Sequence, residues 1–287
     1  MSSLMDRPLL VFGVSLIALW LCAQLGAAVR RKQEAHGERA PETFTVVLTA
    51  SLTLLGLIIG FTFSMAVSRY DMRKSYEAEE ANAIGTEYVR AGLLPASDAT
   101  MTRLLLRSYL DQRILLYQSR DEDRRQQIRQ RITQLQGQLW STVQNAALAQ
   151  PSALTALAAA GMNDVLNSQG YTQAAWWNRI PRAGWLLMSV IALLCNVLLG
   201  YAASGATIRS LLLLILPLLL SIAFLLIADI DSPRGGNIRV SAPNLASLSE
   251  QIALWDSLKQ FSAGPPKLEA VETTAVLEAT KDKRPKV

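Results

Sequence analysis

Four long apolar stretches dominate the pattern of hydrophobic and polar positions along this chain. They cover residues 8–28, 44–67, 184–203 and 208–228, and the only Lys, Arg, Asp or Glu inside them is Arg209, at the edge of the last. A stretch of about 18 or more apolar residues is long enough to cross a hydrocarbon core of about 30 Å. The pattern therefore predicts an integral membrane protein with four transmembrane helices.

The first stretch has a second interpretation, as a secretory signal peptide with Arg7 in front of it. It is longer than the usual apolar region of about 7–15 residues in such peptides. Three basic residues, Arg30, Arg31 and Lys32, follow it at once. We therefore expect a helix that stays in the membrane. Four spans place both termini and the long segment 69–182 on one side of the bilayer.

That long polar segment shows helical periodicity throughout. Residues 69–91 continue the second span without a turn signal, Leu93-Leu94-Pro95 ends the helix, and another helix is expected over Thr100–Gln118. Strand-like alternation is absent from the sequence. The predicted fold class is therefore all-α, with four transmembrane helices and a helical cytoplasmic domain.

A third helix of this segment is expected to begin near Asp121, because acidic residues favour a helix N-terminus. Its apolar positions alternate at spacings of four and three, which is typical of one buried or partner-binding face. They are Ile128, Ile132, Leu135 and Leu139. A fourth, short helix is expected to start at Pro151 and to end near Gly161, since proline fits the first turn of a helix.

The residues after the fourth span predict a turn, an amphipathic helix and a tail. The turn contains Asp229, Asp231 and Pro233, and Ser247 with Glu250 matches a capping box at the start of a helix. From residue 263 the chain has little to bury and is expected to be disordered. The predicted organisation is 1–68, two spans; 69–182, the helical cytoplasmic domain; 183–228, two spans; 229–262, turn and helix; and 263–287, tail.

Composition excludes several classes of function. The chain of 287 residues has one histidine, His36, in a short polar loop, and its two cysteines lie in separate spans. No metal site, cofactor or enzymatic motif is therefore expected. The net charge of +5 comes without a basic patch interleaved with aromatics, so nucleic acid is not an expected partner. The carboxylates Glu77, Glu79 and Glu80 are more typical of a solvated face, or of partners for arginines, than of a catalytic site.

The second span carries two stripes with a spacing of four residues. One consists of Thr53, Leu57, Phe61 and Met65, and the other of Gly56, Gly60, Ser64 and Ser68. Gly-x-x-x-Gly is a close-packing pattern for membrane helices, so the stripes can belong to ordinary packing. They can also let identical helices approach around an axis, with the larger side chains forming apolar rings that constrict a pore. Periodicity leaves both interpretations open.

Two strings of residues give the chain a family resemblance. Phe63-Ser64-Met65-Ala66 and Ser68-Arg69-Tyr70-Asp71 lead into Glu80-Ala81-Asn82-Ala83-Ile84-Gly85-Thr86, and Asp229-x-Asp231-x-Pro233-x-Gly235-x-x-Ile238 follows the fourth span. These strings resemble the bacterial bestrophin-like family, long classed as a domain of unknown function and related to bestrophin anion channels. The resemblance covers roughly residues 8–260.

The resemblance implies a pentameric channel for small anions such as chloride, in a bacterial inner membrane, with both termini cytoplasmic. It places the pore-lining rings on Thr53, Leu57 and Phe61, and the pore mouth on Met65 and Arg69. The lipid bilayer, small anions and identical subunits are the partners that it implies. Arg69 has a second interpretation, as an anchor of the helix at the membrane interface.

The chain also departs from the family pattern. Tyr70-Asp71 stands where the family has an aromatic pair, Thr53 replaces a bulky aliphatic residue, and the turn after the fourth span lacks the run of acids that binds calcium in animal bestrophins. Asp229 and Asp231 are therefore expected to act in capping and turn formation. The alternative function is a non-conducting scaffold or signalling subunit that binds a partner through its cytoplasmic helices.

Overall fold

The computed structural model describes residues 7–36, 43–203, 209–232 and 236–262, and within these ranges the regular elements are all helices. The predicted all-α fold class is confirmed. Four helices are long and apolar enough to cross a membrane, as the sequence predicts. Pro233 and the predicted tail over 263–287 lie outside the described residues.

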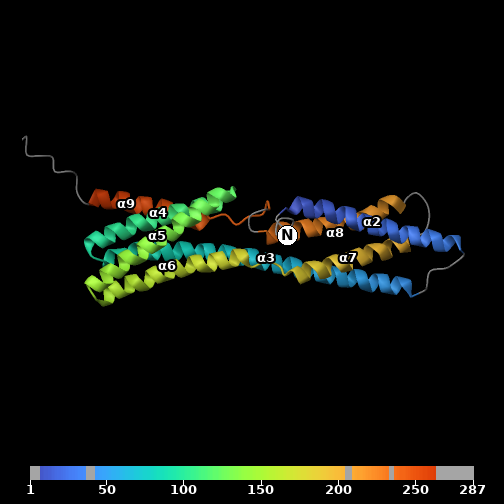
Figure 1. Ribbon diagram of the computed structural model, residues 1–287, viewed down its shortest axis with the longest axis horizontal. Helices are drawn as coiled ribbons and strands as arrows, with labels where there is room; N and C mark the ends of the chain where they lie inside the picture. The colour runs from blue at the N-terminus through green and yellow to red at the C-terminus, as the bar shows by residue number, and fades with distance from the viewer. Residues whose placement is uncertain (1–6, 37–42, 204–208, 233–235, 263–287) are drawn as a thin grey trace, which may run out of the picture.

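The helices form two bundles arranged end to end, which makes the molecule elongated (Figure 1). The membrane bundle contains α2 (Pro8–Ala35), the first half of α3 (Phe44–Arg90), α7 (Arg182–Ala202) and α8 (Arg209–Asp231). The extramembrane bundle contains the second half of α3, the short η1 (Ala91–Leu93), α4 (Ala96–Gln118), α5 (Glu122–Ala149), α6 (Ala153–Trp177) and α9 (Pro243–Ser262). Among the helices of the described ranges, α3 alone runs through both bundles.

The first half of α3, up to Ser68, contains no charged residue, and Arg69 is the first charge after it. Twenty-five residues of helix are about 37 Å long, which is enough to cross a bilayer core. The N-terminal end of α2 lies near the boundary between the two bundles, and α9 packs in the extramembrane bundle (Figure 1). Both described ends of the chain are therefore on the extramembrane side, as four spans require.

The tightest contact in the membrane bundle joins α2 to α7 through two glycines. A methyl group at Gly26 would overlap the carbonyl oxygen of Val197, and one at Gly200 would overlap that of Ala23. Small residues allow membrane helices to approach at backbone distance, where many weak contacts add up. This contact fixes α2 and α7 as a pair, against which α8 and α3 pack.

The core of the extramembrane bundle is formed by facing apolar stripes of its helices. The predicted stripe on α5 has the expected period and is buried, with Ile128, Ile132, Leu135 and Leu139 between 6% and 0% exposed. They pack in one cluster with residues such as Leu110 of α4. The stripe is therefore used inside the chain and is not a free surface for a partner.

Helix boundaries follow the sequence signals at some ends and not at others. Leu94 is extended between η1 and α4, and the Asp121 carboxylate accepts a hydrogen bond from the backbone N–H of Arg124 at 3.1 Å, both as expected. The prediction that a short helix ends near Gly161 is wrong, because α6 continues to Trp177. Ser247 is not a cap either, since α9 begins earlier, at Pro243, and encloses it.

Candidate functional site

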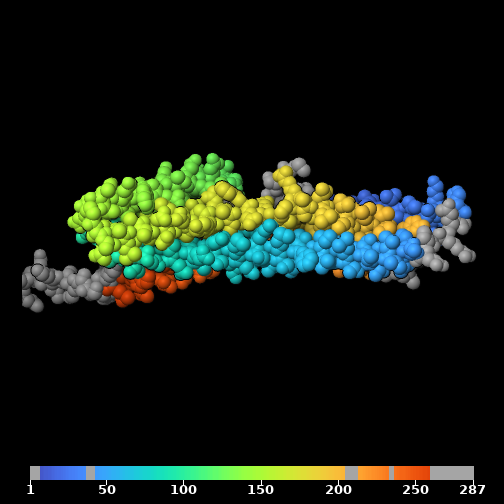
Figure 2. Space-filling view, turned by 90° about the horizontal axis from the view of Figure 1, so that it is seen from below, coloured from blue at the N-terminus to red at the C-terminus, as the bar shows by residue number. Residues whose placement is uncertain are grey.

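Helix α3 has one covered face and one uncovered face along its whole length. The covered face includes Leu55, Ala66, Arg73 and Glu80. On the other side, four hydroxyl-bearing residues recur every eleven residues, and all are exposed: Thr53, Ser64, Ser75 and Thr86. Eleven residues make about three helical turns, so these side chains point in nearly the same direction. Figure 2 shows α3 lying along one side of the molecule without other helices over it.

The predicted pore-lining residues lie on or beside this uncovered face. Thr53 is exposed, and Leu57 and Phe61 are 53% and 65% exposed. Each step of four residues turns the side chain by about 40° around the helix. Met65, which is also exposed, therefore lies about 120° from Thr53, and the stripe winds away from a common axis toward its end.

The small-residue stripe is unused within the chain. A methyl group at Gly56 or at Gly60 would meet no atom within 4 Å. Ser64 and Ser68, which continue the stripe, are exposed. Packing against the other helices of the same chain therefore does not explain these glycines. What remains is a contact with lipid, with an open pathway or with another copy of the chain.

Arg69 lies away from the uncovered face. Its side chain is 14% exposed, and its Nη1 is 3.7 Å from the Asp231 carboxylate at the end of α8. A straight helix places residue 69 about 160° from Thr53, which explains why the two face different ways. The structure thus joins Arg69 to the boundary between the bundles, and its predicted role at a pore mouth stays a prediction.

Arg73, which the sequence indicated only as a basic residue near the membrane, holds this boundary together. Its side chain is 1% exposed. The guanidinium donates to the carbonyl oxygens of Ala175 and Asn178 at the end of α6, both at 3.3 Å, and to those of Ile230 and Asp231 at the end of α8, both at 3.1 Å. The last carbonyls of a helix lack partners within it, so an arginine there satisfies several at once.

The two predicted acids after the fourth span make backbone hydrogen bonds, as expected of capping residues. They lie in the last turn of α8 instead of in a separate turn. Asp231 accepts from the N–H of Ile180 at 3.0 Å, and Asp229 accepts from those of Asn237 and Ile238 at 2.7 and 2.9 Å. A side chain at Gly236 would collide with Asp229, so the glycine permits this closure.

A sequence profile of the Bestrophin-like domain matches residues 9–245. The chain belongs to the bestrophin-like family. No curated protein matches it.

Solved structures of a bacterial bestrophin homologue from Klebsiella pneumoniae have the same fold as this bestrophin-like chain. One, phased with zinc, has a TM-score of 0.60 at 14% identity and covers 88% of this chain and 99% of its own. Two single-substitution variants have TM-scores of 0.60 and 0.61, also at 14% identity, covering 83% and 84% of this chain and 95% and 96% of theirs. Identity this low shows the fold alone.

The string from Glu80 to Thr86 joins α3 to the rest of the extramembrane bundle of this bestrophin-like protein. Glu80 is fully buried and accepts from Arg113 Nε, from Arg113 Nη2 at 2.8 Å and from Thr172 Oγ1 at 3.0 Å. Gly85 leaves room for Leu248 of α9, since a methyl group there would come within 2.9 Å of it. Asn82 is exposed on the uncovered face. Tyr70, further up α3, packs against the core of the membrane bundle.

The neighbouring carboxylates correct the prediction in part. Glu79 is exposed, as on a solvated face, and Glu80 is an arginine partner. Glu77 is neither: it is 1% exposed and accepts from Asn244 Nδ2 at 2.6 Å and from the N–H of Leu245 at 2.9 Å, in the first turn of α9. Glu79 lies about 160° around the helix from Glu77 and is therefore on the other face, whereas Glu77 and Glu80 are about 60° apart and reach different partners from the same covered face, about 4.5 Å apart along the axis.

Glu87 is a third buried carboxylate on the extramembrane half of α3, after Glu77 and Glu80, and no sequence pattern indicates its burial. It is fully buried, and neither carboxylate oxygen has a hydrogen-bond partner among the described residues. Gly161 of α6 lies directly against it. Burial raises the pKa of Glu87 to about 8, with nearby Arg90 opposing the rise and Asp164 adding to it.

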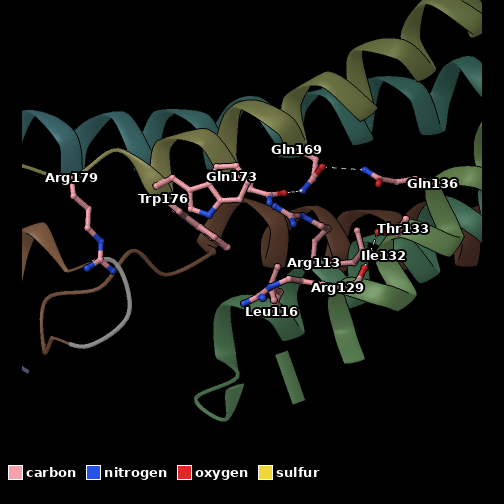
Figure 3. A pocket seen from close by; sticks show the side chains of 11 residues that line it. Arg113, Leu116, Arg129, Ile132, Thr133, Gln136, Gln169, Gln173, Trp176 and Arg179 are labelled. Carbon is pink, nitrogen blue, oxygen red and sulfur yellow. Dashed lines mark hydrogen bonds between the residues drawn. The ribbon is translucent and has the colours of Figure 1, made fainter. Parts of the chain in front are cut away.

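A polar cavity of about 320 Å³ lies in the extramembrane bundle, between α4, α5 and the end of α6 (Figure 3). Arg113, Arg129 and Arg179 line it, and none of its described lining residues is acidic. Gln136 donates to Gln169 at 3.3 Å, and Gln169 donates to Gln173 at 2.9 Å, which orders the amides along one wall. The arrangement presents hydrogen-bond donors to whatever occupies the cavity.

Proposed function

We propose that this bestrophin-like protein assembles as a homopentamer and conducts small anions such as chloride along an axis lined by α3. The observation that carries the proposal is the uncovered face of α3, which crosses the membrane bundle with Gly56 and Gly60 unpacked. A helix that leaves a small-residue face open along a whole span is suited to a symmetric contact around an axis. Thr53, Leu57 and Phe61 would then form the narrowest rings.

Electrostatics at the boundary between the bundles support an anionic substrate. Arg69, Arg73 and Arg179 all lie near the Asp231 carboxylate, which therefore has three positively charged neighbours. A surplus of charge of one sign raises the local concentration of ions of the opposite charge and speeds their entry. We further propose that the extramembrane bundle and both termini are in the cytoplasm of a bacterium whose inner membrane holds the protein.

The alternative function, a non-conducting scaffold, requires an exposed apolar surface for a partner on the extramembrane helices. A partner that binds through the cytoplasmic helices needs an apolar face such as the Ile128–Leu139 stripe of α5, and that stripe is buried in the extramembrane core. Copurification of a stoichiometric partner with the full-length protein would restore this alternative.

The proposal is tested by flux measurements on the purified protein in liposomes. We expect chloride efflux from loaded vesicles, and five subunits per particle by native mass spectrometry. Intact oligomers that pass no anion would overturn the channel, and a dimer would overturn the axial pathway.

The position of the constriction is tested with Phe61→Ala. Removing this 65%-exposed ring from each subunit should widen the pathway and raise chloride flux several-fold. Phe63→Ala is the matched control, because Phe63 is also exposed but lies about 160° away around the helix. Equal flux from the two variants would move the constriction away from Phe61.

A further inference from the structure

We propose that the cavity between α4, α5 and α6 is a binding site for a small organic anion that joins an oxyanion group to a flat ring. Its volume of about 320 Å³ falls at the lower end of small-molecule sites, which are roughly 300–1,000 Å³. The site is separate from the uncovered face of α3. Of its lining residues, Arg179 also belongs to the positively charged boundary invoked for conduction, and the others take no part in it.

The buried side chain of Arg113 has one NH₂ group, Nη1, that is not used in its pairing with Glu80. Its side chain is 1% exposed and lines the cavity. Nε and Nη2 both bond to Glu80. Nη1 makes no hydrogen bond to the described residues and is not one of their fully enclosed unpartnered atoms, so it is open to the cavity. An oxygen of a ligand there can accept from it in a charge-assisted hydrogen bond.

The other polar groups around the cavity agree with an oxyanion. Gln173 uses its oxygen to accept from Gln169, which leaves its NH₂ group as a donor. Arg129, at the rim, is 41% exposed and also pairs with Glu122. Two arginines and an amide N–H are the kinds of donor that usually hold carboxylates and phosphates.

The remaining wall is apolar and suits a ring. Leu116 of α4, Ile132 of α5 and Trp176 of α6 line the cavity. Figure 3 shows Leu116 across from the glutamines of α6 and Trp176 beside Gln173. The Trp176 ring is fixed edge-on against Tyr117, with centroids 5.0 Å apart. An immobile aromatic wall binds flat groups at little entropic cost. An inorganic anion alone would leave this surface unused.

Adenosine 5′-monophosphate and benzoate are the probes, with adenosine and inorganic phosphate as half-ligands. Binding to the purified full-length protein in detergent is measured by calorimetry at constant ionic strength, with thermal stabilisation as a second readout. We expect at least one of the two probes to bind, and adenosine and phosphate to bind at least tenfold more weakly. Failure of both probes would overturn the proposal, and so would phosphate binding as tightly as the better probe.

Variants assign the binding to this cavity. Arg129→Ala and Gln173→Leu should each weaken the better probe about tenfold, the usual worth of a charge-assisted hydrogen bond. Arg131→Ala is the matched control, since Arg131 is an exposed arginine of α5 outside the cavity. Arg113 itself is left intact, because its loss would strand the buried Glu80. Equal affinities in all three variants would place the probe elsewhere, and the outcome does not depend on whether the protein conducts.

Discussion

Two pairs of glycines in the membrane bundle have opposite surroundings. Gly26 and Gly200 lie where α2 and α7 touch backbone to backbone, whereas Gly56 and Gly60 face open space on α3. Both pairs look alike in the sequence, as small residues in apolar helices. The difference shows that a small-residue pattern indicates a close approach without saying whether the partner is in the same chain.

The largest expected effect comes from filling the covered pair. Gly200→Val should destabilise the folded chain by roughly 3 kcal/mol or more, because the new side chain overlaps the Ala23 carbonyl and must push the helices apart. Thermal unfolding in detergent measures this. A variant as stable as the wild type would show that α2 and α7 are not held at the distance seen here.

Gly60→Val tests the uncovered pair of glycines in the same way. We expect the stability of a single chain to change by no more than about 0.5 kcal/mol, since a side chain there meets nothing. If identical helices meet at this face, the same substitution should reduce the oligomer on size exclusion and abolish flux. An intact, conducting oligomer would mean that Gly60 faces lipid.

Carboxylates extend the comparison to the extramembrane half of α3, where Glu87 is covered and Glu79 is open. The pKa of Glu87 is raised to about 8 from 4.5. The folded state therefore holds a proton that the unfolded state releases, and stability should fall as the pH rises from 4.5 to 8, by up to about 1.4 kcal/mol per unit.

The measurement is the melting temperature between pH 5 and pH 8.5 for three proteins. Glu87→Gln should flatten the profile, because the amide stays neutral throughout. Glu79→Gln should retain the wild-type slope. A slope that survives in Glu87→Gln would assign the pH dependence to another group.

The smallest effect is expected on the uncovered face itself, at Asp71. This exposed residue follows Thr53 by eighteen positions, or about five turns, so both point the same way. A carboxylate from each subunit would repel anions from the pathway. Asp71→Asn should therefore shift the reversal potential of the current toward the equilibrium potential of chloride, without altering the stability of the protein. Asp123→Asn, an exposed change on α5, is the control. An unchanged potential would place Asp71 off the pathway.

The sequence predicts those features of the fold that depend on local pattern. Apolar runs located all four spans, and the alternating spacing on α5 identified a true apolar face. Periodicity predicts that this stripe is covered but does not show whether its own chain or a partner covers it. The sequence predicts a helix end near Gly161, whereas the missing side chain of this glycine makes room for Glu87, far away in the sequence.

The site was less predictable because its contacts connect distant residues. The partners of Arg73 are backbone carbonyls more than 100 positions away. Every residue has such a carbonyl, so the sequence cannot identify which ones Arg73 contacts. Arg113 and Glu80 are separated by 33 positions. The family strings marked Glu80 and Asp229 as important without indicating that one binds an arginine and the other two backbone amides.

The continuity of α3 has a mechanical consequence. Its 47 residues form one rod of about 70 Å, held near its middle by the four hydrogen bonds of Arg73. Thr53 is about 30 Å from that attachment and Arg90 about 26 Å on the other side. These two distances are nearly equal, so if α3 pivots at Arg73, a sideways displacement at Arg90 would appear at Thr53 with similar size and opposite direction.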